Sequence, residues 1–260
     1  MCLVSTIITT HDRPDLFKKA LESVLSQEFD SIEILVVDDS CDKNRDLNRK
    51  VCELFKVNYI ENHKHQGSSS SLNIGVEAAK GIFIAILDDD DEWTDSHKIQ
   101  KQVKIFQENK SAVLVGTNGK FVDYDDGSIL KTQSNFNYSP EDIRENMLTS
   151  NPIIHSSVMY RKEAWEKVGG YDPSLARGKD LDLWLKLGLE GELYLVPDVA
   201  VLYRVQNDKQ QNLNHLKYLD TRAKIKIIHR YRKHYKLKVY RYINEYIRLV
   251  IFFFLRFIKK

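Results

Sequence analysis

The sequence is poor in cysteine and offers no pattern by which cysteines would hold the fold together. Its three cysteines, Cys2, Cys41 and Cys52, have neither an even count nor the close spacing of zinc ligands. This argues against a disulfide framework and predicts a reducing compartment. No basic leader precedes His11 in the opening residues MCLVSTIITTHDRP, so we expect no secretory signal peptide. The sequence therefore predicts a cytoplasmic protein.

The sequence also lacks a hydrophobic run long enough to cross a bilayer. The most apolar run, Leu249 to Leu255, has seven residues, whereas a spanning helix needs about 20. It lies in a basic segment, because residues 222–260 carry 13 of the 39 Lys and Arg residues but only one acid, Glu245. Cations beside large apolar side chains are typical of helices that lie on anionic membranes. Interleaved Lys, Arg and Tyr would also suit nucleic acid, but the apolar run favours lipid, and nucleic acid is not expected. We expect residues 208–260 to form a basic, amphipathic helical tail that associates with a membrane.

Upstream of this tail, short apolar runs alternate with helical patterns. The runs that predict strands are VSTIITT (4–10), IEILVVDDS (32–40), VNYIEN (57–62), IFIAIL (82–87) and AVLVGT (112–117). Such alternation predicts an α/β domain over residues 1–207, with a mixed, mainly parallel sheet and flanking helices. Ligands of these sheets bind beyond the carboxyl ends of the strands.

Two groups of carboxylates follow predicted strands at that edge. Asp38 and Asp39 end one strand, and Asp88 to Asp91 with Glu92 end another. Adjacent carboxylates raise each other's pKa unless a cation compensates them. Oxygen ligands suit Mn²⁺ or Mg²⁺, either of which can bridge to a diphosphate. We therefore predict a metal site in the run Asp88 to Asp91; a solvated acidic turn that caps the next helix is the alternative.

Six segments carry a resemblance to a known family. They are, in order, VSTIITTHDRP, ALESVLSQ, IEILVVDDS, SLNIGVEAAKGIFIAILDDDDEW, GGYDPSL and KDLDLWLKL. In this order they are similar to glycosyltransferase family 2, over about residues 3–205. The resemblance implies the GT-A fold, a Rossmann-like architecture of nucleotide-diphospho-sugar transferases. It also implies inverting transfer of a sugar from a nucleotide-sugar donor, which by the family's habit is a UDP-sugar.

The resemblance implies roles for single residues on the donor side. Thr9, His11 and Asp39 would surround the base and ribose, where a carboxylate can accept a hydrogen bond from a uracil N–H.

The family's DxD motif, which binds the metal, falls on Asp88 and Asp90. Asp90 would be the direct metal ligand, and Asp88 would be a further metal contact. Asp88 or Asp89 would also lie beside the ribose. Four consecutive acids leave this register open.

Inversion requires a base that deprotonates the acceptor hydroxyl. The matching aspartate is Asp180, with Asp182 as the fallback, although one of the two would otherwise only cap a helix. Lys179 stands where the family commonly has a glutamate. His155 and Trp184 are candidates for the acceptor side, and the helical spacing of Trp184 equally suits a core position.

The resemblance and the basic tail together imply a peripheral enzyme on the inner face of a membrane. Its acceptor would be a glycan, carried on a polyprenyl diphosphate, in the biosynthesis of a surface polysaccharide such as an O-antigen or capsule. A nucleotidyltransferase is an alternative, but such an enzyme usually has a glycine-rich, lysine-bearing loop after its first strand. A non-catalytic membrane-surface adaptor is a second alternative.

Overall fold

The computed structural model describes residues 3–133, 138–205 and 213–257. The strands are β1 (Val4–Thr10), β2 (Ile32–Asp38), β3 (Asn58–Glu61), β4 (Phe83–Asp88), β5 (Glu92–Trp93), β6 (Ala112–Asp123), β7 (Ile129–Thr132), β8 (Met159–Arg161) and β9 (Glu192–Val205). The helices are α1 (Pro14–Leu25), α2 (Asp42–Phe55), α3 (Ser68–Ala78), α4 (Lys98–Glu108), α5 (Pro140–Asn146), the short 3-10 helix η1 (His155–Ser157), α6 (Lys162–Val168), α7 (Lys179–Glu190), α8 (Leu213–Tyr231) and α9 (Val239–Leu255).

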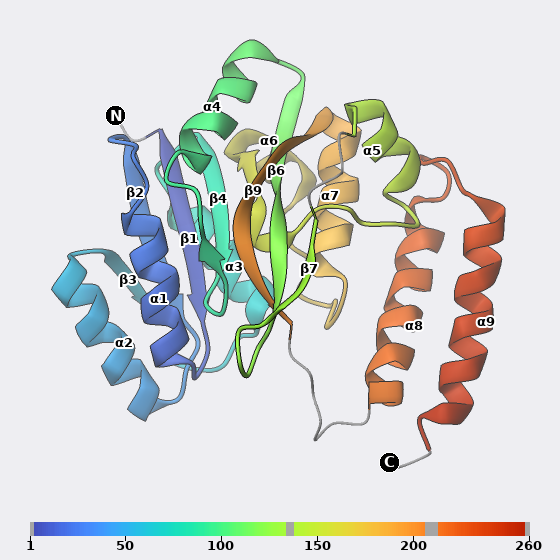
Figure 1. Cartoon of the computed structure of the whole chain (residues 1–260), viewed down its shortest axis with the longest axis horizontal. Coiled ribbons are helices and arrows are strands. Elements are labelled where there is room, and N and C mark those ends of the chain that lie inside the picture. The colour runs from blue at the N-terminus through green and yellow to red at the C-terminus, as the bar shows by residue number, and fades with distance from the viewer. Residues whose placement is uncertain (1–2, 134–137, 206–212, 258–260) are drawn as a thin grey trace.

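The described strands form one sheet in the order β3-β2-β1-β4-β8-β6-β9-β5, with β7 paired to β6. Helices α1, α2 and α4 lie on one face, whereas α3, α6 and α7 lie on the other (Figure 1). Strands β3, β2, β1 and β4 pair in parallel, as do β6 and β9. Strand β8 runs antiparallel to both β4 and β6, and β5 and β7 are antiparallel to β9 and β6, respectively. The predicted α/β architecture is confirmed.

The register of the parallel strands brings the two acid groups together. Thr10 of β1 pairs with Asp38 of β2, and Thr9 pairs with Asp88 of β4. All three strands therefore end at one level, and the carboxylates that follow them share one edge of the sheet, as the sequence predicts.

The sheet is buried on both faces, which explains the nearly continuous apolar runs of its central strands. Successive residues of β1 point to opposite faces. Ile7 packs with Leu72 of α3, whereas Ile8 packs with Phe17 of α1. Two apolar clusters, one on each face, thus hold the edge that carries the acids.

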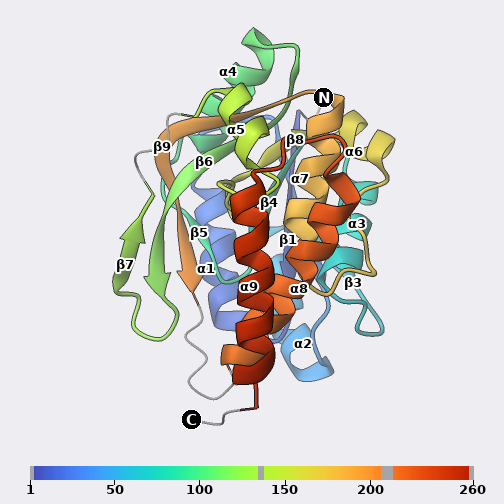
Figure 2. The same cartoon turned by 90° about the vertical axis from the view of Figure 1, so that its right-hand side faces the viewer.

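The expected tail divides into two different parts. Its expected start, at residues 207 and 208, lies outside the described residues. Helix α8 packs against α7, and Ile227, Ile228 and Tyr231 belong to one of the two buried clusters. Helix α9 lies along the outside of α8 (Figure 2). No helix among the described residues has the length and apolar character needed to span a membrane. Helix α8 is therefore part of the folded core, and α9 is the peripheral element.

This division predicts different outcomes for two truncations. A chain that ends at residue 238 loses only α9 and should still unfold cooperatively, because both buried clusters persist. A chain that ends at residue 212 also loses the buried Ile227, Ile228 and Tyr231. Each such side chain contributes about 1.5–3 kcal/mol, so the shorter chain should show no cooperative thermal transition by circular dichroism. A folded chain of 212 residues would contradict the assignment of α8 to the core.

Candidate active site

The four acids after β4 alternate between two environments. Asp89 and Asp91 are buried, with about 1% of each side chain exposed, whereas Asp88 and Asp90 retain 25% and 20%. The turn that follows the strand therefore presents the first and third carboxylates outward. This is the spacing of a DxD motif.

Asp89 is held by two groups from the loop after β1. Its Oδ1 lies 2.5 Å from a terminal nitrogen of Arg13, and its Oδ2 accepts the backbone N–H of His11 at 3.0 Å. Burial raises the pKa of Asp89 to about 6, against the opposing charge of Arg13. Arg13 also pairs with Asp90. The Asp89 carboxylate is enclosed and anchors the Arg13 loop, so of the two acids expected beside the ribose, Asp88 and Asp89, only Asp88 is partly exposed.

Asp91 is held from the opposite side. Its carboxylate accepts the Ser156 hydroxyl and the backbone N–H of Arg204 at 2.8 Å. Burial, followed by the charges of Asp90 and Asp88, raises the pKa of Asp91 well above its ordinary value. The Arg204 side chain binds the carbonyl of Asp90 at 2.6 Å. Strand β9 and helix η1 thus fix the shape of the acid turn.

Asp88 faces the expected acceptor residue His155. Its Oδ2 lies 2.8 Å from His155 Nδ1, and the other ring nitrogen lies 3.2 Å from the hydroxyl of Tyr171. Burial opposes ionisation, but the charge and hydrogen bond of His155 outweigh it and hold the pKa of Asp88 below its ordinary value. Asp88 is therefore an anion at neutral pH, as a metal ligand must be.

Asp88 and Asp180 line the same cavity, which has a volume of about 460 Å³. The cavity lies between the loop before α3, the loop before α7 and the end of β4. A smaller cavity of about 170 Å³ lies next to it, and His155, Asp180 and Tyr203 line both. Asn151 donates to Asp180 Oδ2 at 3.1 Å. Asp180 therefore lies at the boundary between the larger cavity, which Asp88 also lines, and the smaller cavity.

Lys179 brings a cation into the larger cavity. Its ammonium donates to the hydroxyl of Ser68, at the start of α3, and its charge helps to lower the pKa of Asp88. From the sequence, Lys179 is distinguished only as a departure from the family, which commonly has a glutamate at this position. It lies beside the N-terminus of α3, a position that favours an anion.

The structure does not bring Asp182 or Trp184 to the cavity. Asp182 lies two residues after Asp180, about 200° further round the helix. It is fully buried, 2.6 Å from Arg230 of α8, and Tyr231 donates to it at 3.0 Å. Trp184 is fully buried in the core. Asp182 is thus a structural anchor and Trp184 a core residue, because their faces of α7 pack against the domain.

The expected nucleoside residues lie at the ends of β1 and β2. Thr9 is largely buried, while His11 is half exposed in the loop that follows. The carboxylate of Asp39 accepts the backbone N–H groups of Gln66 at 2.8 Å and Gly67 at 2.9 Å. Asn62 donates to it at 3.0 Å. In this structure Asp39 holds the loop before α3, a contact that the spacing of the residues in the sequence does not reveal.

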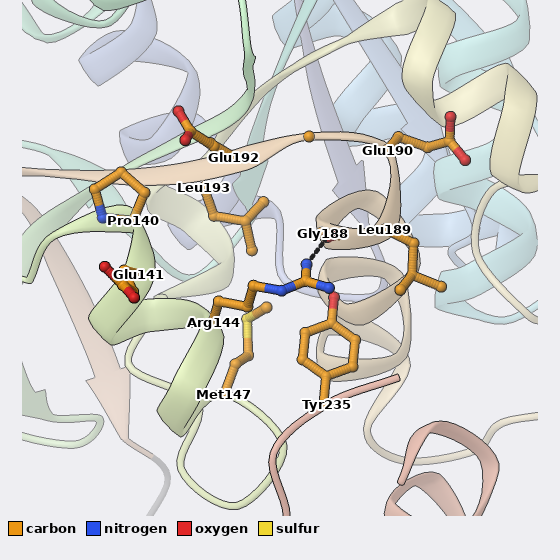
Figure 3. Close-up of a pocket in the computed structure, with 11 residues that line it drawn as sticks. Pro140, Glu141, Arg144, Met147, Gly188, Leu189, Glu190, Glu192, Leu193 and Tyr235 are labelled. Atoms are coloured by element: carbon orange, nitrogen blue, oxygen red, sulfur yellow. Dashed lines mark hydrogen bonds between the residues drawn. The ribbon is translucent and has the colours of Figure 1, made fainter. Parts of the chain in front are cut away.

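A third cavity, of about 450 Å³, lies far from the acids in the fold. Its lining comes from α5, the end of α7, the start of β9 and Tyr235 (Figure 3). Arg144 crosses it and donates to the carbonyl of Gly188 (Figure 3). Its lining includes Glu141, Glu190 and Glu192 but none of the site residues predicted from the sequence.

Asp88 and Asp90 fit a divalent ion. Mg²⁺ usually binds proteins through one or two carboxylates and completes its shell with water and substrate phosphates, and Mn²⁺ prefers the same oxygen ligands. Two partly exposed carboxylates on one turn satisfy that requirement. Arg13 pairs with one oxygen of Asp90, so an ion would bind through the other oxygen or displace Arg13 from Asp90.

Comparisons with known proteins agree with this geometry. A model described as "Glycosyl transferase family 2" matches residues 5–169. An uncharacterized glycosyltransferase of Methanocaldococcus jannaschii is 26% identical, over 97% of this chain and 88% of that protein. A putative teichuronic acid biosynthesis glycosyltransferase of Bacillus subtilis, TuaG, is 29% identical over 79% of this chain and 80% of that protein. The chain spans 66% of the length of two related Rickettsia proteins.

Solved structures show the same fold. The mannosyltransferase PcManGT from Pyrobaculum calidifontis, in complex with GDP-Man and Mn²⁺, has a TM-score of 0.71 at 16% identity and covers 97% of this chain and 73% of that one. S. aureus TarS in complex with UDP-GlcNAc has a TM-score of 0.66 at 15% identity and covers 98% and 72%. The predicted GT-A fold is confirmed.

The ion pair between Arg13 and the buried Asp89 makes a measurable prediction. Arg13→Met should lower the free energy of unfolding by about 3 kcal/mol, because it leaves a buried carboxylate without its cation. Adding Asp89→Asn to Arg13→Met should recover part of that loss, since an amide carries no charge. Denaturant unfolding measures both effects.

Arg49→Met is the matched control. Arg49 pairs with Glu61 where both side chains keep some exposure, so its loss should cost about 1 kcal/mol or less. Equal losses for Arg13→Met and Arg49→Met would contradict the anchoring role of Asp89.

Proposed function

This chain belongs to glycosyltransferase family 2, and from that premise we propose that it is a metal-dependent, inverting enzyme whose donor is a UDP-sugar. The observation that carries the proposal is the shared cavity of Asp88 and Asp180. Asp88, the proposed metal ligand, and Asp180, the proposed base, both line this space. A sugar held between them can be attacked on the face opposite its leaving group.

The donor side of the cavity suits a diphosphate. When bound, Mn²⁺ or Mg²⁺ neutralises negative charge on the leaving diphosphate. Asp88 and Asp90 would hold that ion. Lys179 and residues 68–70 at the start of α3 line the same cavity, and the Lys179 ammonium and the backbone N–H groups of that helix start would bind the phosphate oxygens. Thr9, His11 and Asp39 would lie at the nucleoside end, where the loop held by Asp39 must open to admit a base.

Asp180 would act as the general base. Asn151 occupies one oxygen of its carboxylate, which orients the group and leaves the other oxygen for the acceptor. The acceptor O–H bond breaks, and its proton passes to Asp180. The acceptor oxygen then bonds to the anomeric carbon as the bond to the diphosphate breaks. His155 and Tyr203 line both cavities and would position the acceptor, which enters from the smaller one.

The acceptor is proposed to be a glycan on a polyprenyl diphosphate, used in surface polysaccharide biosynthesis. The similarity to TuaG, named for teichuronic acid biosynthesis, supports a polysaccharide product. A lipid-linked acceptor requires the enzyme to work at a membrane surface. The described helix α9 has the features of such a contact.

Helix α9 exposes an apolar stripe. Ile243, Ile247, Val250 and Phe254 follow one another at spacings of four, three and four residues, so they lie on one face, and each is more than half exposed. The helix carries Arg241 and Arg248, and 13 Lys or Arg residues fall within 222–260. We propose that this stripe enters the headgroup region of an anionic, inner membrane face while the cations contact phosphates.

Nucleotide binding provides the first test of the donor site. Calorimetric titration with UDP, GDP, dTDP and CMP should show one favoured nucleotide, UDP, that binds more tightly with Mn²⁺. Asp90→Ala should weaken the Mn²⁺-dependent binding at least tenfold, because it removes a direct ligand of the ion.

Asp180→Asn is the matched variant for this test. It should retain nucleotide binding and lose about 10²–10⁴-fold in sugar transfer, the usual contribution of a positioned base. Failure of every nucleotide to bind would overturn the proposed function and favour a non-catalytic membrane-surface adaptor.

The membrane contact predicts a second measurable effect. Ile247→Asp combined with Phe254→Asp should reduce binding to phosphatidylglycerol vesicles at least tenfold, because two apolar side chains can no longer enter the bilayer. Vesicle sedimentation measures it. Leu54→Asp, at a 71% exposed apolar position on α2, should bind vesicles like the wild type. Equal loss from all these variants would contradict a role specific to α9.

A further inference from the structure

Three side chains from separate segments converge beside the nucleoside end of the cavity. His11 follows β1, Asp39 follows β2, and His65 lies in the loop before α3. Each offers one ligand atom, and the three atoms lie within 4.8 Å of one another. Asp39 is buried, whereas 51% of the His11 side chain and 65% of the His65 side chain are exposed. The cluster thus combines a fixed carboxylate with two accessible imidazoles.

The contact of His11 determines which ring nitrogen can bind a metal. Its Nδ1 lies 2.8 Å from the main-chain carbonyl of Asp39, which can only accept a hydrogen bond. Nδ1 therefore carries the hydrogen, and in the neutral ring Nε2 carries the lone pair. A backbone carbonyl that fixes the tautomer in this way is typical of histidines that bind metals.

His65 and Asp39 are already near the spacing of two ligands on one ion. His65 Nδ1 lies 2.8 Å from Asp39 Oδ2, with one proton between them. Bonds of about 2.0–2.1 Å in a tetrahedral site place neighbouring ligand atoms about 3.4 Å apart. An ion can replace that proton if the two atoms separate by about 0.6 Å. His65 is exposed on its loop, so this movement requires no repacking of the core.

We propose that His11, Asp39 and His65 form a binding site for a transition-metal ion such as Zn²⁺, with water as the remaining ligand. Imidazole nitrogens favour Zn²⁺ over the hard ions Mg²⁺ and Mn²⁺, which prefer oxygen ligands such as those of Asp88 and Asp90. The site therefore differs from the acid turn both in position and in the ion that it selects.

Occupancy of this site would also affect the donor. His11 and Asp39 are the proposed nucleoside contacts, so Zn²⁺ bound to them would compete with the nucleotide. This consequence, unlike the metal site itself, rests on the proposed function.

Zn²⁺ binding to the full chain tests the site. Competition with a chromophoric chelator should give one tight Zn²⁺ per wild-type chain. His65→Ala should weaken that binding at least tenfold, and His11→Ala should do the same. His63→Ala is the matched control, because His63 lies two residues away on the same loop, is 89% exposed and faces Glu61. Its Zn²⁺ affinity should equal that of the wild type.

The outcomes separate this proposal from the proposed function. Absence of Zn²⁺ binding, or equal affinity of His65→Ala and wild type, would overturn the metal site even if UDP binds with Mn²⁺. Zn²⁺ binding that depends on His65 would support the metal site even if no nucleotide binds. If both bind, saturating Zn²⁺ should raise the apparent Kd for UDP at least tenfold in wild type, and His65→Ala should abolish that increase.

Discussion

Compensation of the charges on Asp88 to Asp91 is the constraint on which the rest of the site depends. Four consecutive carboxylates end a strand that is buried on both faces, and repulsion among them must be offset in the fold. The compensating groups come from elements far apart in the sequence: Arg13 from the loop after β1, His155 and Ser156 from η1, and Arg204 from β9. Through these contacts the acid turn joins the parallel strands β3, β2, β1 and β4 to the half of the sheet that contains β8, β6 and β9. The same contacts enclose two carboxylates and leave two facing outward.

The site also depends on helix α7, which carries Asp180. The face of α7 opposite Asp180 is bound by helix α8. Asp180 faces the cavity at its N-terminus, while Asp182 on the opposite face is bound by Arg230 and Tyr231 of α8. Helix α8 reaches the cavity as well, through the pair between Arg177 and Asp220 at 2.5 Å. The position of the candidate base therefore depends on a C-terminal helix. Helix α9, which is proposed to meet the membrane, packs on α8 and is thus connected through α8 to the helix that carries Asp180.

Asp39 illustrates how one residue can serve several purposes. Its carboxylate holds the loop before α3, its carbonyl fixes the ring of His11, and it contacts His65. A ligand that enters this end of the cavity must exchange some of these contacts for its own. The loop before α3 also lines the cavity proposed for the diphosphate, so the proposed entry of a base and the proposed binding of its phosphates would involve the same loop.

The sequence by itself determined the alternating α/β pattern and the common edge of the two acid groups. It could do so because apolar periodicity is local and because parallel strands place their carboxyl ends together. Its order of motifs also identified the family and the cavity residues Asp88 and Asp180. Only the tertiary structure decided which acids of the run face outward. It also decided that Asp182 and Trp184 belong to the core and that α8 packs on the domain instead of forming a separate tail. Each of these depends on partners tens of residues away, such as Arg230 for Asp182 and Arg13 for Asp89. Burial of a side chain, and its pairing with a residue that is distant in the sequence, depend on how helices and strands pack. The local sequence pattern cannot predict that packing.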